Sequence, residues 1–256
     1  MLRWRIATAL LLAPVVLGAI LLGRWAVLAL VLAVVALAAY ELSQALNPLP
    51  FPAALGAGAF PVLLSVPFGA GGVLGGTVLA LPWALFWLAG RPEARTLRAL
   101  LALMLMSLWV GAPMAMLALI AREESGVLLI LIAVVGPWVS DSGAYFAGRL
   151  AGRHPMFPSL SPKKTIEGAL GGLLLTVAAV GLLAHYALGL SPLQAALAGA
   201  AISVFSQSGD LFESLLKRMM EIKDLGNTLP GHGGILDRVD SLLFTAPAVY
   251  YILLLI

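Results

Sequence analysis

The sequence predicts an all-α, polytopic integral membrane protein with about nine transmembrane helices. Of its 256 residues, 61% are hydrophobic and only 11% are charged, whereas a soluble domain carries about 25% charged residues. Several windows exceed the roughly 18 consecutive apolar residues that indicate a membrane-spanning helix. Because cysteine is absent, a disulfide framework, a thiolate metal site and a cysteine nucleophile are excluded.

Each expected helix is an apolar run bounded by charged residues, glycine or proline. The first run follows Arg3 and Arg5 like a signal peptide, but no convincing cleavage region precedes the next run at Trp25, so we expect a transmembrane helix. Pro61 and Pro67 interrupt the third run, and several glycines open the fourth, where small residues favour close helix packing. The expected spans are 4–22, 25–46, 51–67, 72–90, 97–120, 126–147, 166–189, 192–216 and 236–256.

The basic residues support this segmentation and predict its orientation. With the N-terminus in the cytoplasm, only Arg24 and Arg122 face outward, which is the positive-inside bias typical of membrane proteins. An odd number of spans then leaves the C-terminus outside. The basic residues that face inward are Arg3, Arg5, Arg91, Arg95, Arg98, Arg149, Arg153, Lys163, Lys164, Lys217, Arg218, Lys223 and Arg238.

Charged residues gather in the segment Ser214–Asp240 and just before it, in a chain that is otherwise largely apolar. Asp210, Ser214 and Lys217 are spaced i, i+4, i+7, so they share one helix face, with Glu213 beside it. An ion-pair network at the end of a helix explains this spacing equally well. The segment also contains Arg218, Lys223 and Arg238.

A glycine-rich turn around His232 lies within the same segment. Its glycines permit unusual backbone angles, and successive amides in such turns form anion-binding nests. Asp237 and Asp240 follow, spaced i, i+3 on the first turn of the last expected helix, so both can point at one place. Acidic residues also favour a helix start, which explains Asp237 but not the cost of a charged Asp240 deeper in the membrane. The glycines are Gly231, Gly233 and Gly234.

A third group of polar residues begins near the end of the sixth expected span. Asp141 and Tyr145 are spaced i, i+4 in an otherwise apolar helix, which makes Asp141 a candidate site residue. Ser161 then precedes two adjacent lysines, Lys163 and Lys164, just before the seventh span. Such lysines most often contact anionic lipid headgroups, but they can also bind a phosphate.

Together these residues indicate phosphoryl or nucleotidyl transfer at the inner membrane surface. Carboxylates hold Mg²⁺, which takes phosphate oxygens as further ligands, and lysine and arginine neutralise polyphosphate charge. Zinc is not expected, because three scattered histidines and no cysteine give no ligand spacing. One of these histidines, His154, lies in a loop with no evident partner.

The segment Ser214–Asp240 resembles the signature of the phosphatidate cytidylyltransferases, also called CDP-diacylglycerol synthases, at every fixed position. Asp141–Arg149 and Ser161–Gly168 are similar to two further pieces of that family, whereas the N-terminal half matches only as generic apolar helices. The resemblance implies a membrane enzyme that condenses CTP with phosphatidic acid, giving CDP-diacylglycerol and pyrophosphate. It also implies Mg²⁺, with a second cation as an open alternative, and a homodimer.

The resemblance and the residue types together suggest roles, and no nucleic acid is expected as a partner. We expect residues 1–122 to form a scaffold of five spans and residues 123–256 to form the catalytic region at the cytoplasmic face of the cell membrane. The metal ligands are expected among Asp141, Asp210, Asp237 and Asp240. The catalytic residues are expected to be Asp210, Lys217, Arg218, Lys223, Asp237, Arg238 and Asp240. The substrate-binding residues are expected to be Tyr145, Ser161, Lys163, Lys164, Ser214, Gly231, His232, Gly233 and Gly234.

Two alternative functions remain at this stage. Another CTP-using membrane enzyme, such as a polyprenol kinase or a synthase acting on archaeal ether lipids, would share the phosphate site but take a different lipid. A transporter would spread its polar residues across the spans, including outward-facing ones. In this sequence they crowd at one face, which favours chemistry at the surface.

Overall fold

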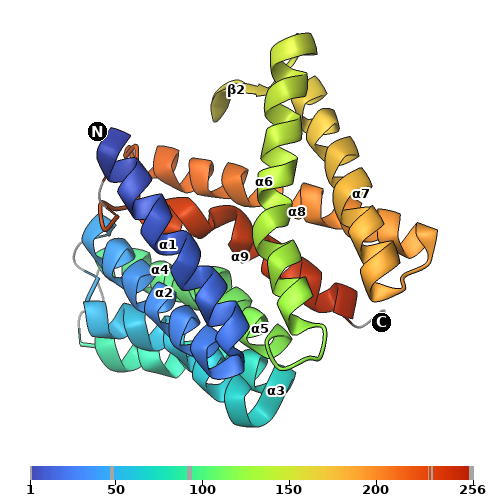
Figure 1. Cartoon of the computed structure of the whole chain (residues 1–256). Helices are drawn as coiled ribbons and strands as arrows, with labels where there is room; N and C mark the ends of the chain where they lie inside the picture. The colour runs from blue at the N-terminus through green and yellow to red at the C-terminus, as the bar shows by residue number, and fades with distance from the viewer. Residues whose placement is uncertain (1, 47–48, 91–93, 230, 232, 254–256) are drawn as a thin grey trace. The chain divides into compact units, whose positions relative to one another are not determined.

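The computed structural model describes residues 2–46, 49–90, 94–229, 231 and 233–253. Within them the named secondary-structure elements are helices, apart from one short β hairpin (Figure 1). It forms two compact units, which are described separately below. Unit 1 comprises Met1–Val127 and Asp224–Arg238, and unit 2 comprises Leu128–Lys223 and Val239–Ile256. The division of roles expected at residue 122 stays a prediction.

Unit 1 is built from apolar helices joined by short turns. Gly23 joins the first two helices with a φ of 92°, a backbone angle that favours glycine. A short π-helical stretch, η1, continues α4 directly into α5. The elements are α1 (Leu2–Leu22), α2 (Arg24–Ala45), α3 (Phe51–Leu88), α4 (Ala94–Leu105), η1 (Met106–Gly111) and α5 (Ala112–Ile120).

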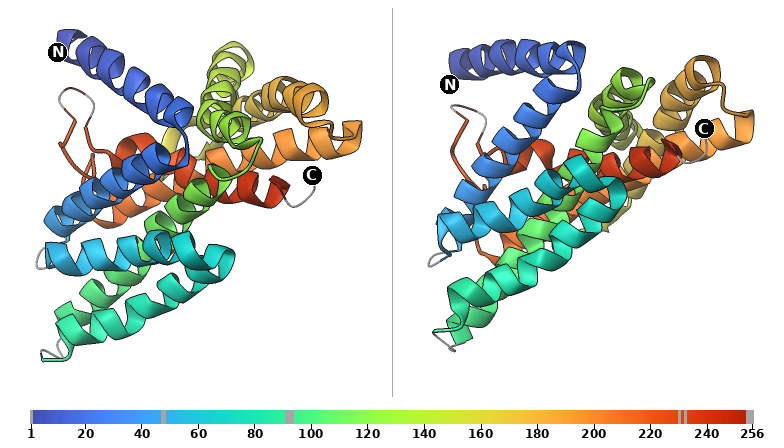
Figure 2. Two further views of the ribbon diagram at one scale, coloured as in Figure 1. Left: turned by 60° about the horizontal axis from the view of Figure 1, so that its bottom comes forward. Right: turned by 90° about the horizontal axis from the view of Figure 1, so that it is seen from below.

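The long helix α3 is a hairpin of two antiparallel arms. Its helical path breaks at Gly69, which has φ 57° and ψ −137°, so the sequence correctly predicts two helices here. A Cβ atom on Gly72 would lie 1.9 Å from the Leu64 carbonyl oxygen, and one on Gly76 would lie 2.5 Å from that of Phe60. The arms therefore touch backbone to backbone (Figure 2), which only glycine allows.

Unit 2 contains the remaining helices and the hairpin. The strands are antiparallel, with Pro155 opposite Thr165 and Phe157 opposite Ser161. The prediction of an all-α chain misses this hairpin, because strands of three and five residues rich in proline and lysine carry no period-two hydrophobic pattern. The elements are α6 (Gly126–Ala151), β1 (Pro155–Phe157), β2 (Ser161–Thr165), α7 (Ile166–Leu188), α8 (Pro192–Met219) and α9 (Leu236–Leu253), of which α6 and α9 begin in unit 1.

Small residues bring α6 and α7 together at the point where both helices approach the β hairpin. A Cβ atom on Gly143 would lie 2.8 Å from the Gly171 carbonyl oxygen, and one on Gly168 would lie 2.9 Å from that of Ala144. Helix α7 then turns into α8 through Gly189, which has a φ of 70°, and the capping box of Ser191. The α6–α7 crossing fixes the helix ends from which the site in unit 2 is built.

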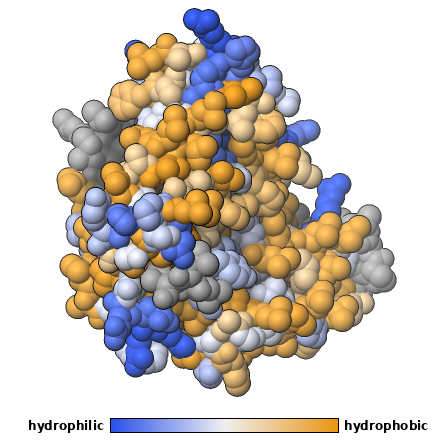
Figure 3. Space-filling view, turned by 90° about the vertical axis from the view of Figure 1, so that its right-hand side faces the viewer, coloured by the Kyte–Doolittle hydropathy of each residue, from blue (hydrophilic) through white to orange (hydrophobic). Residues whose placement is uncertain are grey.

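The structure confirms a helical membrane protein. Among the described residues, five helical stretches are long and apolar enough to cross a membrane. Hydrophobic side chains also predominate on the face drawn in Figure 3, as expected for helices that contact lipid. The five stretches are Arg24–Ala45, Phe51–Leu88, Thr96–Ile120, Gly126–Ala151 and Ile166–Leu188.

The hairpin of α3 predicts a clear difference between neighbouring glycines. We expect Gly72→Ala to destabilise the protein by about 1–3 kcal/mol, because the new methyl group would overlap the Leu64 carbonyl. Gly75→Ala is the matched control, since nothing lies within 4 Å of its Cβ position. Thermal unfolding of the purified variants in detergent measures both. Equal unfolding midpoints for the two variants would contradict the close packing of the arms.

Candidate functional site

A polar cavity in unit 2 brings together residues from α6, the β hairpin, α7 and α8. Its volume is about 510 Å³, which lies within the roughly 300–1,000 Å³ of pockets that bind small ligands. Both signs of charge line it, which suits a ligand with anionic groups and a bound cation. The charged and polar side chains that line it are Asp141, Tyr145, Arg149, Lys163, Lys164, Thr165, Gln207 and Asp210.

A salt bridge between two residues that line this cavity joins Lys164 to Asp210. Lys164 Nζ lies 2.7 Å from Asp210 Oδ2, and the two side chains are 28% and 35% exposed. Lys164 is in β2 and Asp210 is in α8, so the ion pair links the hairpin to the helix. Partial burial strengthens a charge pair relative to one at an open surface. The pair therefore fixes the position of a lysine and a carboxylate at the cavity wall.

Glu167 holds the start of the hairpin from the first turn of α7. Its carboxylate accepts hydrogen bonds from the backbone N–H groups of Arg153, at 3.1 Å, and His154, at 3.3 Å. It also contacts His154 Nδ1, so the prediction that His154 lacks a partner is wrong. Thr165 completes the anchor, since its hydroxyl accepts from the Gly168 N–H and caps α7. These contacts place the two lysines of β2 against the cavity.

Helix α6 supplies an acid and an aromatic side chain to the same wall. Asp141 and Tyr145 both line the cavity, as their i, i+4 spacing predicts. Arg149, one turn further on, donates a hydrogen bond of 2.7 Å to the Tyr145 hydroxyl. The guanidinium group keeps further N–H donors, which suit a phosphate oxygen.

Three carboxylates in unit 2 form a second feature, which shares Asp210 with the cavity. Candidate ligand oxygens of Asp210, Glu213 and Asp240 all lie within 4.8 Å of one another. Lys217 Nζ lies 2.9 Å from Glu213 Oε2, and Glu213 is only 2% exposed. Oxygen donors of this kind are the ligands that Mg²⁺ prefers. The three side chains could therefore supply oxygen ligands to a divalent cation.

The glycine-rich part of the charged segment belongs to unit 1, where a buried glutamate of α2 holds it. Glu41 is only 1% exposed, although it lies in a helix that is otherwise apolar. Its carboxylate accepts hydrogen bonds from the N–H groups of Ile235, at 2.6 Å, and Leu236, at 3.0 Å, and from the Thr228 hydroxyl. A carboxylate at the first amides of α9 is favoured by the helix dipole. Glu41 therefore fixes both the loop and the start of α9.

Glycines let the loop close over this carboxylate. A Cβ atom on Gly226 would lie 2.4 Å from Glu41 Cδ, and one on Gly234 would lie 2.6 Å from Glu41 Oε2. Gly231 and Gly233 have φ angles of 77° and 80°, so both adopt the left-handed conformation that glycine accommodates. The Asp237 carboxylate accepts a hydrogen bond of 2.9 Å from the Gly234 N–H. The expected turn is thus present, while His232 lies outside the described residues.

The structure brings together only some of the residues that the sequence singles out. Asp141, Tyr145, Lys163, Lys164 and Asp210 line one cavity, and Asp240 joins Asp210 in the carboxylate cluster. The described residues that line the cavity do not include Ser161, Ser214, Lys217, Arg218 or Lys223. Gly231, Gly233, Gly234, Asp237 and Arg238 lie in unit 1. The catalytic, metal-binding and substrate-binding roles of all these residues stay predictions.

Two acidic residues were not among the expected site residues. Glu213 lies i, i+3 from Asp210, so helical spacing alone could place it beside that carboxylate. Glu41 is a glutamate inside an apolar span, and an ionisable residue in such a position indicates a site by default. Its partners, however, are almost two hundred positions away in the chain, so the sequence could not identify them.

Several helices can cross a bilayer, and lysines, an arginine and carboxylates surround one pocket. These features define a class of membrane protein equipped to handle phosphorylated substrates. The comparison with known families narrows this class. The chain belongs to the cytidylyltransferase family, whose model matches residues 3–256.

Curated relatives agree with this family. The chain is 44% identical over 134 residues to a phosphatidate cytidylyltransferase of Bacillus subtilis, covering 52% of this chain and 50% of that protein. It is 36% identical over 211 residues to the one of Mycobacterium bovis, covering 76% of this chain and 68% of that protein. The matches thus span from half to about two thirds of these relatives' length.

The contacts of Glu41 predict how its removal affects the loop. Glu41→Ala leaves the Ile235 and Leu236 amides without their acceptor, at a cost of roughly 1–3 kcal/mol each. We expect these amides to exchange with deuterium at least about tenfold faster, as measured by hydrogen exchange of the purified protein. Glu41→Gln should have a smaller effect, because its amide oxygen can still accept. The exposed Glu124→Ala is the control, and unchanged exchange in Glu41→Ala would contradict the anchoring role.

Proposed function

We propose that the chain is a phosphatidate cytidylyltransferase, which transfers the cytidylyl group of CTP to phosphatidic acid and forms CDP-diacylglycerol and pyrophosphate. The observation that carries the proposal is the cavity of unit 2, where Lys164 pairs with Asp210 beside Asp141 and Lys163. Family membership and the names of the relatives support the same reaction.

The reaction requires charge neutralisation more than a strong base. The phosphate of phosphatidic acid is already an anionic nucleophile. One of its oxygens forms a bond to the α-phosphorus of CTP, and the bond from that phosphorus to the bridging oxygen of the β-phosphate breaks, so pyrophosphate leaves with the electron pair. Lys163, Lys164 and Arg149 line the cavity and would bind the phosphate oxygens. Such positioning and charge stabilisation provide most of the catalysis in phosphate transfer.

A divalent cation, Mg²⁺, is part of the proposal. Asp210, Glu213 and Asp240 would hold it, since their oxygens are hard donors already close to one another. When bound, the cation would supply positive charge for the nucleotide phosphates. Lys217 pairs with Glu213 and would set how much negative charge the cluster presents. Asp141 at the cavity wall remains a candidate for a second cation or for orienting Lys164.

The proposal includes an arrangement in the membrane. We expect nine spans, a cytoplasmic N-terminus, an outer C-terminus and an active site at the cytoplasmic face of the cell membrane. The break of α3 at Gly69 supports the count, because it divides one long helix into two arms. The distribution of basic residues supports the orientation. A homodimer, which the family resemblance implies, belongs to the proposal as well.

Transfer of label tests the reaction. Purified protein in detergent receives phosphatidic acid, Mg²⁺ and CTP labelled in the cytosine, and label in the organic phase is counted. We expect labelled lipid from the wild type and at least a hundredfold less from Asp210→Asn and Lys164→Gln, because both changes break the ion pair at the cavity. Glu124→Gln, in an exposed loop of unit 1, is the control that should keep full activity.

The label also separates other outcomes. Folded protein that gives no labelled lipid with cytosine-labelled CTP would contradict the proposal. If γ-labelled CTP then labelled the lipid, the reaction would be a phosphoryl transfer. Full activity in both Asp210→Asn and Lys164→Gln would show that the transfer takes place away from this cavity.

The carboxylate cluster predicts a change in the dependence on the cation. Asp240→Asn removes one of three charged donors, so we expect half-maximal activity to require at least about tenfold more Mg²⁺. Rates measured across a Mg²⁺ titration test this, with Glu124→Gln as the control. An unchanged Mg²⁺ dependence in Asp240→Asn and in Glu213→Gln would remove these residues from the cation site.

A further inference from the structure

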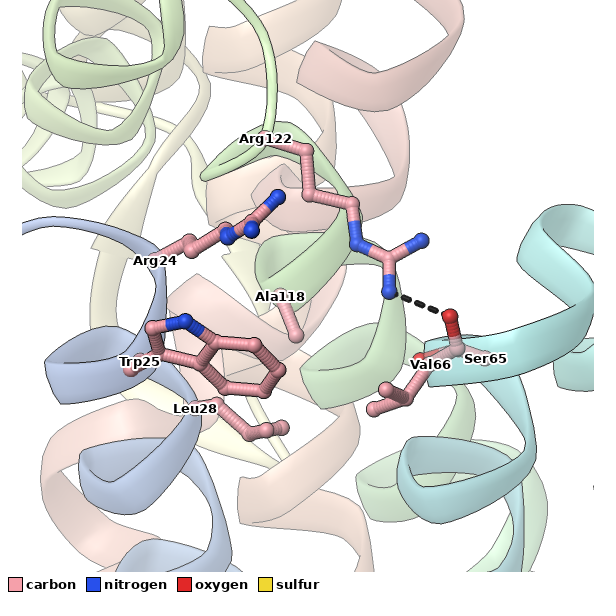
Figure 4. A pocket seen from close by; sticks show the side chains of 7 residues that line it. All are labelled: Arg24, Trp25, Leu28, Ser65, Val66, Ala118 and Arg122. Carbon is pink, nitrogen blue, oxygen red and sulfur yellow. Dashed lines mark hydrogen bonds between the residues drawn. The ribbon is translucent and has the colours of Figure 1, made fainter.

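Two arginines that the proposed reaction does not use meet in a pocket of unit 1. Arg24 and Arg122 are the two basic residues that the positive-inside pattern predicts to be on the outer side. They come from the start of α2 and the turn after α5, and both line a pocket of about 340 Å³ (Figure 4). Figure 4 shows both guanidinium groups directed into the same space. The exceptions to the positive-inside bias therefore share one location.

Both guanidinium groups retain donors for a ligand. Within the described residues Arg122 donates one hydrogen bond, to the Val66 carbonyl, so most of its five N–H groups have no partner there. The Arg24 guanidinium lies 5.1 Å from the centre of the Trp25 ring, a cation–π contact that involves the ring face and leaves its N–H edges available. Two arginines directed at one space repel each other, so an anion between them would stabilise the arrangement.

Among the residues that the structure describes, no acidic side chain forms an ion pair with either arginine. The adjoining turn contains Glu123 and Glu124, and both are exposed. Within the described part of the chain, neither forms an ion pair with Arg24 or Arg122. The pocket therefore keeps its positive charge.

Apart from Ser65, the other side chains that line the pocket are apolar, and its surroundings are typical of a membrane interface. Trp25, Leu28 and Val66 form much of the lining. Trp25 is 63% exposed, as is common for tryptophan at the level of lipid headgroups. The pocket is also far from the glycine loop: Arg24 and Glu41 are separated by seventeen residues of one helix, or about 26 Å. A ligand here would not occupy the loop that Glu41 anchors.

We propose that this pocket binds the phosphate group of an anionic lipid, with the guanidinium groups of Arg24 and Arg122 on the phosphate oxygens and the glycerol and upper acyl groups against Trp25 and Leu28. Arginine binds phosphate through paired N–H groups, so two guanidinium groups at one apolar-lined pocket suit the phosphate of a lipid headgroup. Free inorganic phosphate shares the same chemistry but gains nothing from the apolar lining.

Binding of phosphatidylglycerol to the full-length protein tests the proposal without relying on enzymatic activity. Native mass spectrometry of protein from neutral detergent counts bound lipid as phosphatidylglycerol is titrated, with phosphatidylcholine as the zwitterionic comparison. We expect Arg24→Gln and Arg122→Gln each to weaken one binding event about tenfold or more. Arg98→Gln, an exposed arginine of α4, is the matched control and should leave that event unchanged.

Further measurements distinguish a lipid phosphate from free inorganic phosphate, and a loss of binding from a loss of folding. A double Arg24→Lys, Arg122→Lys variant keeps the charge and should bind more tightly than the double glutamine variant. Competition by millimolar inorganic phosphate would contradict a lipid site and indicate a free-phosphate site instead. Equal binding of phosphatidylglycerol in wild type and the folded double glutamine variant, or equal binding of phosphatidylcholine and phosphatidylglycerol by the wild type, would overturn the proposal.

Discussion

The ion pair of Lys164 and Asp210 is the interaction on which the site in unit 2 depends. A charged side chain in a helical membrane protein is costly unless a partner compensates it, and here each charge compensates the other at 2.7 Å. The pair needs the β hairpin to lie against α8, and the hairpin is held by Glu167 and by the glycine crossing of α6 and α7. The glycines at the crossing of α6 and α7 thus shape the cavity that the neighbouring charged side chains line.

Unit 1 applies the same constraint to the glycine-rich loop. Glu41 has three donors from the loop and the start of α9, so the buried carboxylate is compensated by hydrogen bonds. Gly226 and Gly234 are required there because any side chain would overlap the carboxylate. The spacing of the glycines in the segment therefore has a local explanation in this unit, independent of any ligand. Binding and anchoring are different roles for its glycines, and the anchoring role is visible in the contacts.

Much of the fold could be predicted from the sequence, because apolar runs in this chain end at clear signals. The expected span 166–189 closely matches α7, which begins at its Thr165 cap and ends at Gly189. The hairpin of β1 and β2 could not be predicted, since its strands are too short to show a pattern. The candidate site was found in part: Asp141, Lys164 and Asp210 meet, as intramembrane charges suggest. The contacts of Glu41 depend on distant tertiary packing, which local spacing does not encode.

Photo-crosslinking of CTP to the purified protein tests the account most directly. An azido-CTP is irradiated with the protein in Mg²⁺, and the modified peptides are identified by mass spectrometry with and without excess CTP. We expect crosslinks that excess CTP prevents in the peptides that line the cavity of unit 2. These peptides come from α6 around Asp141 and Tyr145, from the hairpin, or from α8 around Asp210. If the crosslinks that excess CTP prevents lay only in peptides outside that lining, the cavity of unit 2 would not be the nucleotide site.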